Sequence, residues 1–266
     1  MSGTLYLIPV PLGPVAPGQH LHPDTLALIR PLTHFVVEQA KTARAFLKAV
    51  GTDTPLQALH LEELNEHSRG KRIDHLLDPL RAGHDVGLLS EAGCPAVADP
   101  GADLVALAQQ ENIRVAPLVG PSSLLLALMG SGLNGQRFAF QGYLPAKEPE
   151  RSKSLRDLES ESRKKHQTQL FIETPYRNHA LFEALLQTCQ PSTRLCVATD
   201  LTLPGEQARI TQRFRAASAE DRHRLTAHIP AGRLGTGEDV ANAVRFLVSP
   251  ASGYVNGEVL AVTGGA

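Results

Sequence analysis

Small residues follow two short apolar runs near the middle of the chain. Ser90, Ala92 and Gly93 come directly after the run 86–89, and Ser122 and Ser123 come after the run 113–119. Short side chains leave the backbone accessible, so the N–H groups of such turns can donate hydrogen bonds to a ligand. This pattern predicts a binding site for a small molecule that is held largely by backbone groups.

Strands and helices are expected to alternate around these turns. The run 86–89 is predicted to be a buried strand, 102–110 a helix, and 113–119 a second strand whose turn starts another helix at Ser122. In open α/β sheets, ligands bind in the crevice outside the carboxyl ends of the strands. Both turns are therefore expected at the ligand-binding edge of a sheet.

The composition limits the classes of function. A chain of 266 residues that is 42% hydrophobic can bury a large core, in one large or two medium domains. Its net charge of -1 gives no global attraction to nucleic acid, so an RNA substrate would need a local basic surface. Cys94, Cys189 and Cys196 form no C-x-x-C pair, which argues against a metal site or a disulfide framework. The same widely spaced cysteines favour a reducing cytoplasm, and with no long apolar run we expect a soluble protein without a membrane segment.

Several phrases carry a family resemblance. Those at 90–95 (SEAGCP), 99–101 (DPG) and 117–122 (PLVGPS) resemble the tetrapyrrole methylase fold family of S-adenosylmethionine-dependent methyltransferases. The phrase at 142–147 (GYLPAK) is similar to one in the branch that methylates a ribosomal RNA ribose at its 2′-oxygen. The resemblance runs from about residue 4 to about residue 203.

This resemblance implies an α/β fold with two domains, each a mainly parallel or mixed sheet flanked by helices, and a cofactor cleft between them. It also implies S-adenosylmethionine as the cofactor, ribosomal RNA or the small ribosomal subunit as the partner, a homodimer, and no metal. The positions that match the family's cofactor-binding turns are Leu12, Gly13, Ser90, Ala92, Gly93, Ser122, Ser123, Glu173 and Thr174. The positions that match its substrate side are Asn65, Glu66, His67 and Lys147.

Four charged residues are candidates for the chemistry that the resemblance implies. Methyl transfer from a sulfonium needs the nucleophile and the methyl group aligned at about 3 to 3.5 Å, with water excluded. A ribose hydroxyl is a poor nucleophile, so a nearby base or cation would help. Glu91 and Glu173 are candidates for the base, and Lys41 or Arg177 for the cation.

The chain is expected to divide into an N-terminal α/β domain, 1–120, a C-terminal α/β domain, 121–213, and an atypical tail, 214–266. The charged segment 148–166 of the second domain fits two interpretations. It could be an ordinary solvated helix face, or a surface that contacts RNA phosphates and makes affinity fall with salt.

The tail resembles the end of a short-chain dehydrogenase/reductase, which raises an NAD(P)-dependent reductase as a rival function. The first predicted strand lacks the glycine-rich turn such enzymes need. Tyr143 and Lys147 have the spacing of a Tyr-x-x-x-Lys pair, but Pro145 between them is unfavourable in a helix. We expect 258–262 to pair as a closing strand and 238–248 to form a helix. A tetrapyrrole substrate, or a non-catalytic nucleotide- or RNA-binding remnant, remains an alternative.

Overall fold

The computed structural model describes residues 2–65, 73–212 and 258–263. Contacts between Cα atoms divide the chain into two compact units, Met1–Ser122 and Ser123–Ala266. We call them unit 1 and unit 2 and describe each by itself. The functional assignment of these parts as domains, and the cofactor cleft expected between them, stay predictions.

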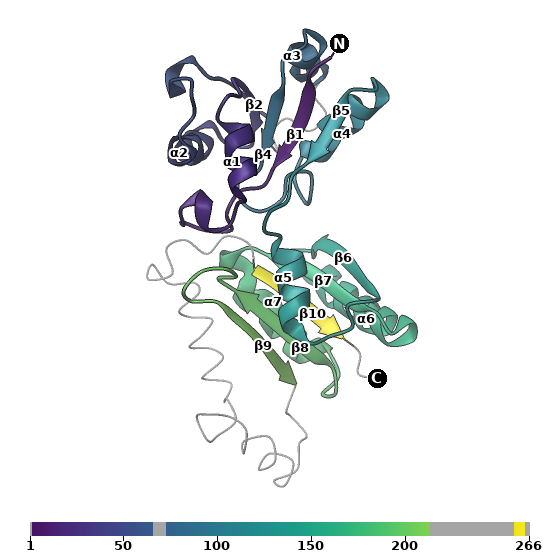
Figure 1. Cartoon of the computed structure of the whole chain (residues 1–266). Coiled ribbons are helices and arrows are strands. Elements are labelled where there is room, and N and C mark those ends of the chain that lie inside the picture. Colours follow the sequence, from purple (N-terminus) through teal and green to yellow (C-terminus); the bar gives the residue numbers. More distant parts are fainter. Residues whose placement is uncertain (1, 66–72, 213–257, 264–266) are drawn as a thin grey trace. The chain divides into compact units, whose positions relative to one another are not determined.

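Unit 1 is built on a parallel sheet (Figure 1). Every neighbouring pair of its strands is parallel, so all their carboxyl ends lie at one edge of the sheet. The strand order is β3 (His60–Glu63), β2 (His34–Val37), β4 (Val86–Leu89), β1 (Thr4–Ile8) and β5 (Arg114–Pro117).

Helices cover both faces of this sheet. One face packs against α1 (Pro23–Ile29) and α2 (Ala40–Val50), and the other against α3 (Asp78–Arg81) and α4 (Gly101–Gln110). Among the described residues of unit 1, short 3-10 helices lie in the connections: η1 (Pro17–Gln19), η2 (Leu56–Ala58) and η4 (Asp74–Leu77).

The pattern of apolar residues explains these layers. Along β2, Phe35 and Val37 belong to the core on the α2 side, and Val36 to the core on the α4 side, as the two-residue period of a strand requires. Along α2, Ala43, Phe46, Leu47 and Val50 recur at helical spacing and are all buried in the core. Gly87 permits the close packing between strands, because a Cβ there would come within 2.7 Å of both Ile8 Cδ1 and Phe35 Cδ1.

Unit 2 contains a mixed sheet whose middle strand comes from the end of the chain. The strand order is β6 (Phe138–Tyr143), β7 (Thr168–Glu173), β10 (Glu258–Thr263), β8 (Arg194–Thr199) and β9 (Gln207–Gln212). β6 and β7 are parallel, whereas β10 is antiparallel to both of its neighbours and β9 is antiparallel to β8. It follows that β7 and β8 run in the same direction, with β10 reversed between them.

The helices of unit 2 pack on both faces of this sheet (Figure 1). On one face, α5 (Ser123–Ser131) lies against β10, β8 and β9. On the other, α6 (Glu150–Lys165) and α7 (Pro175–Thr188) enclose Phe171 of β7 with leucines from both helices. Burying each such side chain contributes about 1.5–3 kcal/mol to folding.

The structure confirms the expected α/β class with mainly parallel or mixed sheets and flanking helices. It also confirms the closing strand predicted at 258–262, since β10 pairs with both β7 and β8. The helix predicted at 238–248 lies outside the described residues. Across the described part of the chain, no helix combines the length and the apolar character that crossing a membrane requires.

Candidate functional site

Loops after β1, β4 and β5 meet at the carboxyl edge of the sheet in unit 1. The backbone of Val10 and that of Gly93 exchange a pair of N–H···O bonds, each 2.9 Å long. The thiol of Cys94 donates to the carbonyl oxygen of Pro121 at 3.3 Å. Three segments that are far apart in the sequence are therefore joined by direct contacts.

Glycine is required at two places where these loops touch. Gly93 has a φ of 73°, and a Cβ there would lie 3.3 Å from Leu12 Cδ2 and 3.6 Å from the carbonyl oxygen of Pro121. At Gly120 a Cβ would come within 2.2 Å of Pro9 Cγ. Larger residues would push the loops apart, so the cradle formed by 9–13, 90–94 and 118–121 depends on these glycines.

The structure thus gathers in one cradle most of the residues predicted to bind the cofactor in unit 1. The Ser90 hydroxyl turns back onto the carbonyl oxygen of Ala92 at 3.2 Å, which leaves small groups along the loop after β4. Leu12 and Gly13 belong to the loop after β1. Ser122 ends unit 1 and Ser123 is the first residue of α5. Both serines are half-buried, and their part in cofactor binding stays a prediction.

Sequence reasoning missed the structural role of Asp99 in this loop. Its Oδ1 accepts hydrogen bonds from the backbone N–H of Ala96 at 3.0 Å and of Gly101 at 2.7 Å. Ala96 and Ala98 have φ values of 64° and 65°, an uncommon conformation for residues with a Cβ. Burial raises the pKa of the Asp99 carboxyl, while these N–H groups act to lower it. The Asp-Pro-Gly phrase before a helix was the signal that could have identified this loop anchor.

Three carboxylates lie at or just after the carboxyl ends of neighbouring strands in unit 1. Glu38 Oε2 accepts from the backbone N–H of Glu91 at 2.7 Å, and Glu63 Oε1 accepts from the N–H of Ala40 at 2.8 Å. The hydroxyl of Thr42 donates to Glu91 Oε1 at 2.5 Å. These contacts fix the backbone and carboxylate of Glu91 while the residue remains exposed. It is therefore placed to accept a proton from a group that approaches this edge.

Two more predicted residues lie on the same side of unit 1. Lys41 is exposed in the first turn of α2, directly after β2. Asn65 follows β3 and is half-buried. Glu66 and His67, which were predicted together with Asn65, lie outside the described residues. The carboxyl ends of the parallel strands thus bring the candidate base, the candidate cation and one candidate substrate contact to one edge.

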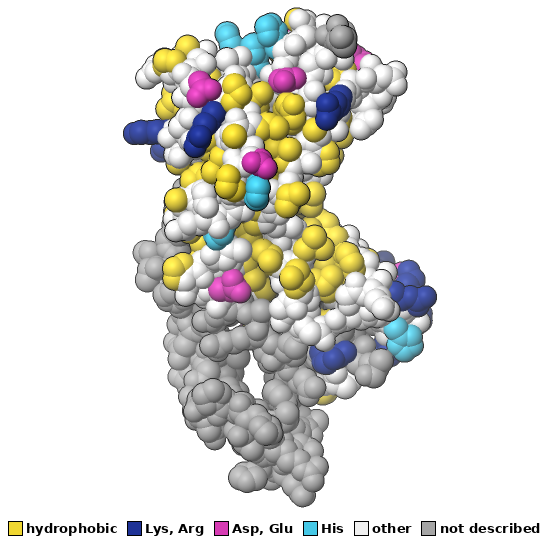
Figure 2. All heavy atoms as spheres, viewed as in Figure 1, with side chains coloured by type: hydrophobic (Ala, Val, Ile, Leu, Met, Phe, Trp, Pro, Cys, Tyr) yellow, Lys and Arg dark blue, Asp and Glu magenta, His cyan; other side chains and the backbone are white. Residues whose placement is uncertain are grey.

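Unit 2 carries a basic face on α6. Within one arc of about 100° on this helix, four exposed cations project from its surface: Lys153, Arg156, Arg163 and Lys164. Figure 2 shows the Lys and Arg side chains gathered on the α6 side of unit 2. Cations in the last turn complement the helix dipole, but those in the first half of the helix do not. Dipole complementarity therefore leaves Lys153 and Arg156 unexplained.

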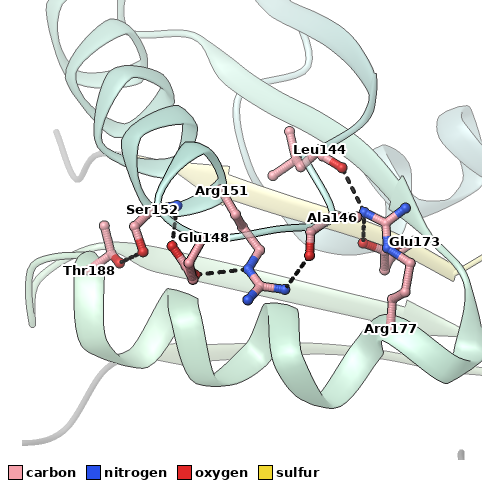
Figure 3. Close-up of polar contacts among 8 residues, drawn as sticks. All are labelled: Leu144, Ala146, Glu148, Arg151, Ser152, Glu173, Arg177 and Thr188. Carbon is pink, nitrogen blue, oxygen red and sulfur yellow. Dashed lines mark hydrogen bonds and ion pairs between the residues drawn. The ribbon is translucent and has the colours of Figure 1, made fainter.

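Glu173 and Arg177 join the ends of β6 and β7 in unit 2 (Figure 3). Glu173 ends β7 with a side chain only 1% exposed, and its Oε2 lies 3.1 Å from Arg177 Nη2. Glu173 Oε1 also accepts from the N–H of Thr174 at 2.8 Å. The same Nη2 of Arg177 donates to the carbonyl oxygen of Leu144, just after β6, at 2.7 Å. Two residues predicted to act in the reaction are thus held in internal contacts.

The described residues hold no group of three His, Cys, Asp or Glu side chains placed to bind a metal ion. The Tyr-x-x-x-Lys spacing of a reductase is also not realised on a helix. Tyr143 ends β6 and Lys147 lies in the loop before α6, so the two side chains do not share a helix face.

Comparisons with known proteins separate the tail from the rest of the chain. Residues 208–266 match the family described as Enoyl-(Acyl carrier protein) reductase. Residues 5–217 match the family described as Tetrapyrrole (Corrin/Porphyrin) Methylases. The reductase match includes β10, whereas the loops of the cradle and α6 and α7 fall within the methylase match.

Two curated relatives are both named Ribosomal RNA small subunit methyltransferase I. That from Pseudomonas aeruginosa is 36% identical over 176 residues, which cover 66% of this chain and 58% of that protein. That from Xylella fastidiosa is 37% identical over 203 residues, which cover 75% of this chain and 69% of that protein. The chain therefore spans between about three fifths and two thirds of the length of these relatives.

A solved structure supports the fold. The methyltransferase CobJ has a TM-score of 0.56 to this chain at 17% sequence identity, with 99% of this chain and 94% of that chain covered. The fold, the methylase match over residues 5–217 and the identity to the Xylella fastidiosa relative agree. The chain belongs to the tetrapyrrole (corrin/porphyrin) methylase family.

Proposed function

We propose that this protein transfers a methyl group from S-adenosylmethionine to a ribose 2′-oxygen of ribosomal RNA. The observation that carries the proposal is the cradle of unit 1, where backbone contacts and required glycines leave small groups around the meeting point of three loops. Membership of the family supports the cofactor, and the names of the two relatives support the RNA substrate. A homodimer and a cytoplasmic location belong to the same proposal, the first from the family resemblance and the second from the composition of the sequence.

The cradle suits a cofactor that is held by backbone groups. Gly93 and Gly120 keep the loops after β1, β4 and β5 close together, and side chains as small as those of Ser90 and Ala92 leave space beside them. When bound, S-adenosylmethionine supplies a methyl group activated on a sulfonium. The task of the protein is then to align the acceptor oxygen with that methyl group and to exclude water.

Among the candidate bases, Glu91 fits the task better than Glu173. Glu91 is exposed, and Thr42 and Glu38 fix its position by hydrogen bonds. Glu173 is buried and its carboxylate already binds Arg177 and the backbone of Thr174. We therefore assign to Glu91 the removal of the proton from the 2′-hydroxyl, a contribution of about 10²-fold or more to the rate.

The candidate cations differ in the same way, since Lys41 is exposed in unit 1 whereas Arg177 is held in an ion pair with Glu173 in unit 2. Lys41 is exposed at the carboxyl edge of unit 1, where it can stabilise negative charge that develops on the acceptor oxygen. Exposed Lys147 and the basic face of α6 supply the local positive surface that an RNA substrate requires. Such contacts to phosphates position the RNA without reading its sequence.

Two measurements test the proposal. Isothermal titration calorimetry with S-adenosylmethionine and with NADPH should show binding of the first and none of the second. Incubation with tritiated S-adenosylmethionine and small ribosomal subunits should label the RNA, and the label should resist alkali as a 2′-O-methylated dinucleotide. Binding of NADPH alone would favour the reductase, and label that enters a porphyrin precursor and not RNA would favour the tetrapyrrole alternative.

A further inference from the structure

The loop 144–149 joins β6 to α6 and carries Lys147 on an exposed stretch. Its first residue, Leu144, is buried in the core of unit 2 beside Phe171. Pro145, Ala146 and Lys147 are exposed. The loop therefore leaves the core at Leu144 and presents the Lys147 side chain at the surface.

Two arginines from different helices hold the backbone of this loop (Figure 3). From α7, Arg177 Nη2 donates to the carbonyl oxygen of Leu144 at 2.7 Å. From α6, Arg151 Nη1 donates to the carbonyl oxygen of Ala146 at 3.2 Å. The carbonyl oxygen of Lys147 itself accepts from the backbone N–H of Arg151 at 3.0 Å. Three of the loop's four carbonyl groups between residues 144 and 147 thus have a defined partner.

Each arginine is in turn fixed by a carboxylate. Glu173 lies 3.1 Å from Arg177, and Glu148 lies 3.0 Å from Nε of Arg151. Hydrogen bonding to Ser152 holds the pKa of Glu148 below its usual value, with Arg151 adding to the effect. In Arg151 the planar guanidinium directs Nε to the carboxylate and Nη1 to the carbonyl, a fork that the flexible point charge of a lysine does not reproduce. In Arg177 the terminal Nη2 makes both contacts, and a lysine side chain ends one atom short of that position. These charge-assisted contacts therefore neutralise the two carboxylates and also fix the direction in which each arginine meets the loop backbone.

We propose that Arg177 and Arg151 are positioning residues that hold Lys147 ready for a phosphate group of the RNA substrate. The proposal rests on the proposed function. It gives Glu173 and Arg177 a role different from the catalytic one expected of them. They act on the loop through its backbone, so the loop is ordered during folding and not during binding. An ordered loop loses less conformational freedom when it meets the RNA.

The test measures the affinity of the full chain for purified bacterial small ribosomal subunits between 50 and 200 mM KCl. Lys147→Ala should weaken binding about 5- to 10-fold and reduce the slope of log affinity against log salt by about one. Both lysine variants keep the charge, but Arg151→Lys loses the fork and Arg177→Lys loses the reach of Nη2, and each should weaken binding about 3- to 10-fold. In steady-state methylation they should raise KM for the subunits more than they lower kcat.

A double-variant cycle separates positioning from simple fold stability. If the arginines act through Lys147, adding Arg177→Lys or Arg151→Lys to Lys147→Ala should weaken binding no further. Arg81→Lys in unit 1 is the matched control, because Arg81 also binds a carboxylate in a fork, with both Glu111 oxygens within 2.9 Å. This control should lower the melting temperature without changing affinity for the subunits or its salt slope.

Three outcomes would overturn the inference. The first is unchanged affinity for the subunits in both arginine variants. The second is that an arginine variant weakens binding equally in the wild-type chain and in Lys147→Ala, and the third is that Arg81→Lys weakens binding as much as the other two arginine variants do. If Arg177→Lys does not fold, Arg151→Lys decides the question, since its partner Glu148 is the more exposed of the two carboxylates. Failure of the proposed function is recognised separately, by the absence of S-adenosylmethionine binding and of methyl transfer in the wild-type chain.

Discussion

The two sheets of this protein are completed in different ways. In unit 1 every strand comes from one stretch of sequence and is parallel to its neighbours, so each strand-to-helix turn falls at the same edge. In unit 2 the middle strand, β10, comes from the end of the chain and runs against both neighbours. Without it, β7 and β8 would each present an unpaired edge.

The candidate cofactor site in unit 1 and the sheet of unit 2 place different demands on the sequence. The cradle of unit 1 depends on particular small residues, because a Cβ at Gly120 would enter the space of Pro9. The gap between β7 and β8 needs a short apolar strand that can form backbone hydrogen bonds on both sides. A tail that matches the family described as Enoyl-(Acyl carrier protein) reductase meets that requirement with the run 259–262.

Removing residues 258–266 should have the largest effect, because it deletes the central strand of unit 2 and the pairing on both of its sides. We expect the unfolding transition of unit 2 to be lost and that of unit 1 to persist, as followed by circular dichroism during heating. Removal of 264–266 alone is the control and should change neither transition. An unchanged melting profile after the longer deletion would show that the sheet does not need β10.

Variants of Glu91 and Glu173 distinguish a carboxylate that acts in catalysis from one that stabilises the fold. Glu91→Gln should lower kcat for methyl transfer about 100-fold and leave the melting temperature unchanged, since an amide cannot act as a base. Glu173→Gln should instead lower the melting temperature, because it leaves Arg177 without its ion-pair partner. Full activity of the Glu91→Gln variant would remove Glu91 as the base.

Gly120→Ala tests the dependence of the cradle on small residues. The new Cβ would come within 2.2 Å of Pro9, and relieving such a contact costs about 1–3 kcal/mol. We expect affinity for S-adenosylmethionine to fall about tenfold or more in calorimetric titration. Gly18→Ala is the matched control, because a Cβ there would meet only Leu26 at an ordinary 3.8 Å. Equal affinities in both variants would contradict the assignment of the cradle.

The smallest expected effect is a pH dependence confined to unit 1. The ring of His34 stacks on those of His60 and His84, with centroids 4.6 and 4.9 Å away, and Thr33 Oγ1 lies 3.0 Å from its Nδ1. Burial, then the charges of His60 and His84, lower the pKa of His34 below its usual value of 6.5. Figure 2 shows histidines gathered at the end of unit 1 where the chain begins.

A lowered pKa means that folding favours the neutral imidazole of His34. Its contribution to stability is therefore complete above pH 6.5 and declines as the pH falls through the folded-state pKa. The melting temperature of unit 1 should fall slightly between pH 7 and pH 5, and less so in a His34→Gln variant. A variant with the same pH profile as the wild type would show that the stack does not contribute.

Local sequence pattern was sufficient for much of the fold and for part of the site. The buried run of β4, the helix α4 that follows it and the small-residue turns after β4 and β5 are all properties of neighbouring residues. Asp99 was noted only as part of a family motif, and its bonds to the N–H groups of Ala96 and Gly101 were not foreseen, although Asp-Pro-Gly before a helix could have indicated them. Glu173 and Arg177 were recognised as special, but their contacts with the loop at Leu144 were not foreseen.

The sequence by itself determined the α/β class, the edge at which small-residue turns would lie, and the capacity of the tail to form a strand, because each follows from the period and size of adjacent side chains. Only the tertiary structure decided that β10 lies between β7 and β8, that Gly120 meets Pro9, and that Arg151 and Arg177 hold the loop of Lys147. The physical reason is that these contacts join residues distant in the chain, and their partners are selected by packing in three dimensions.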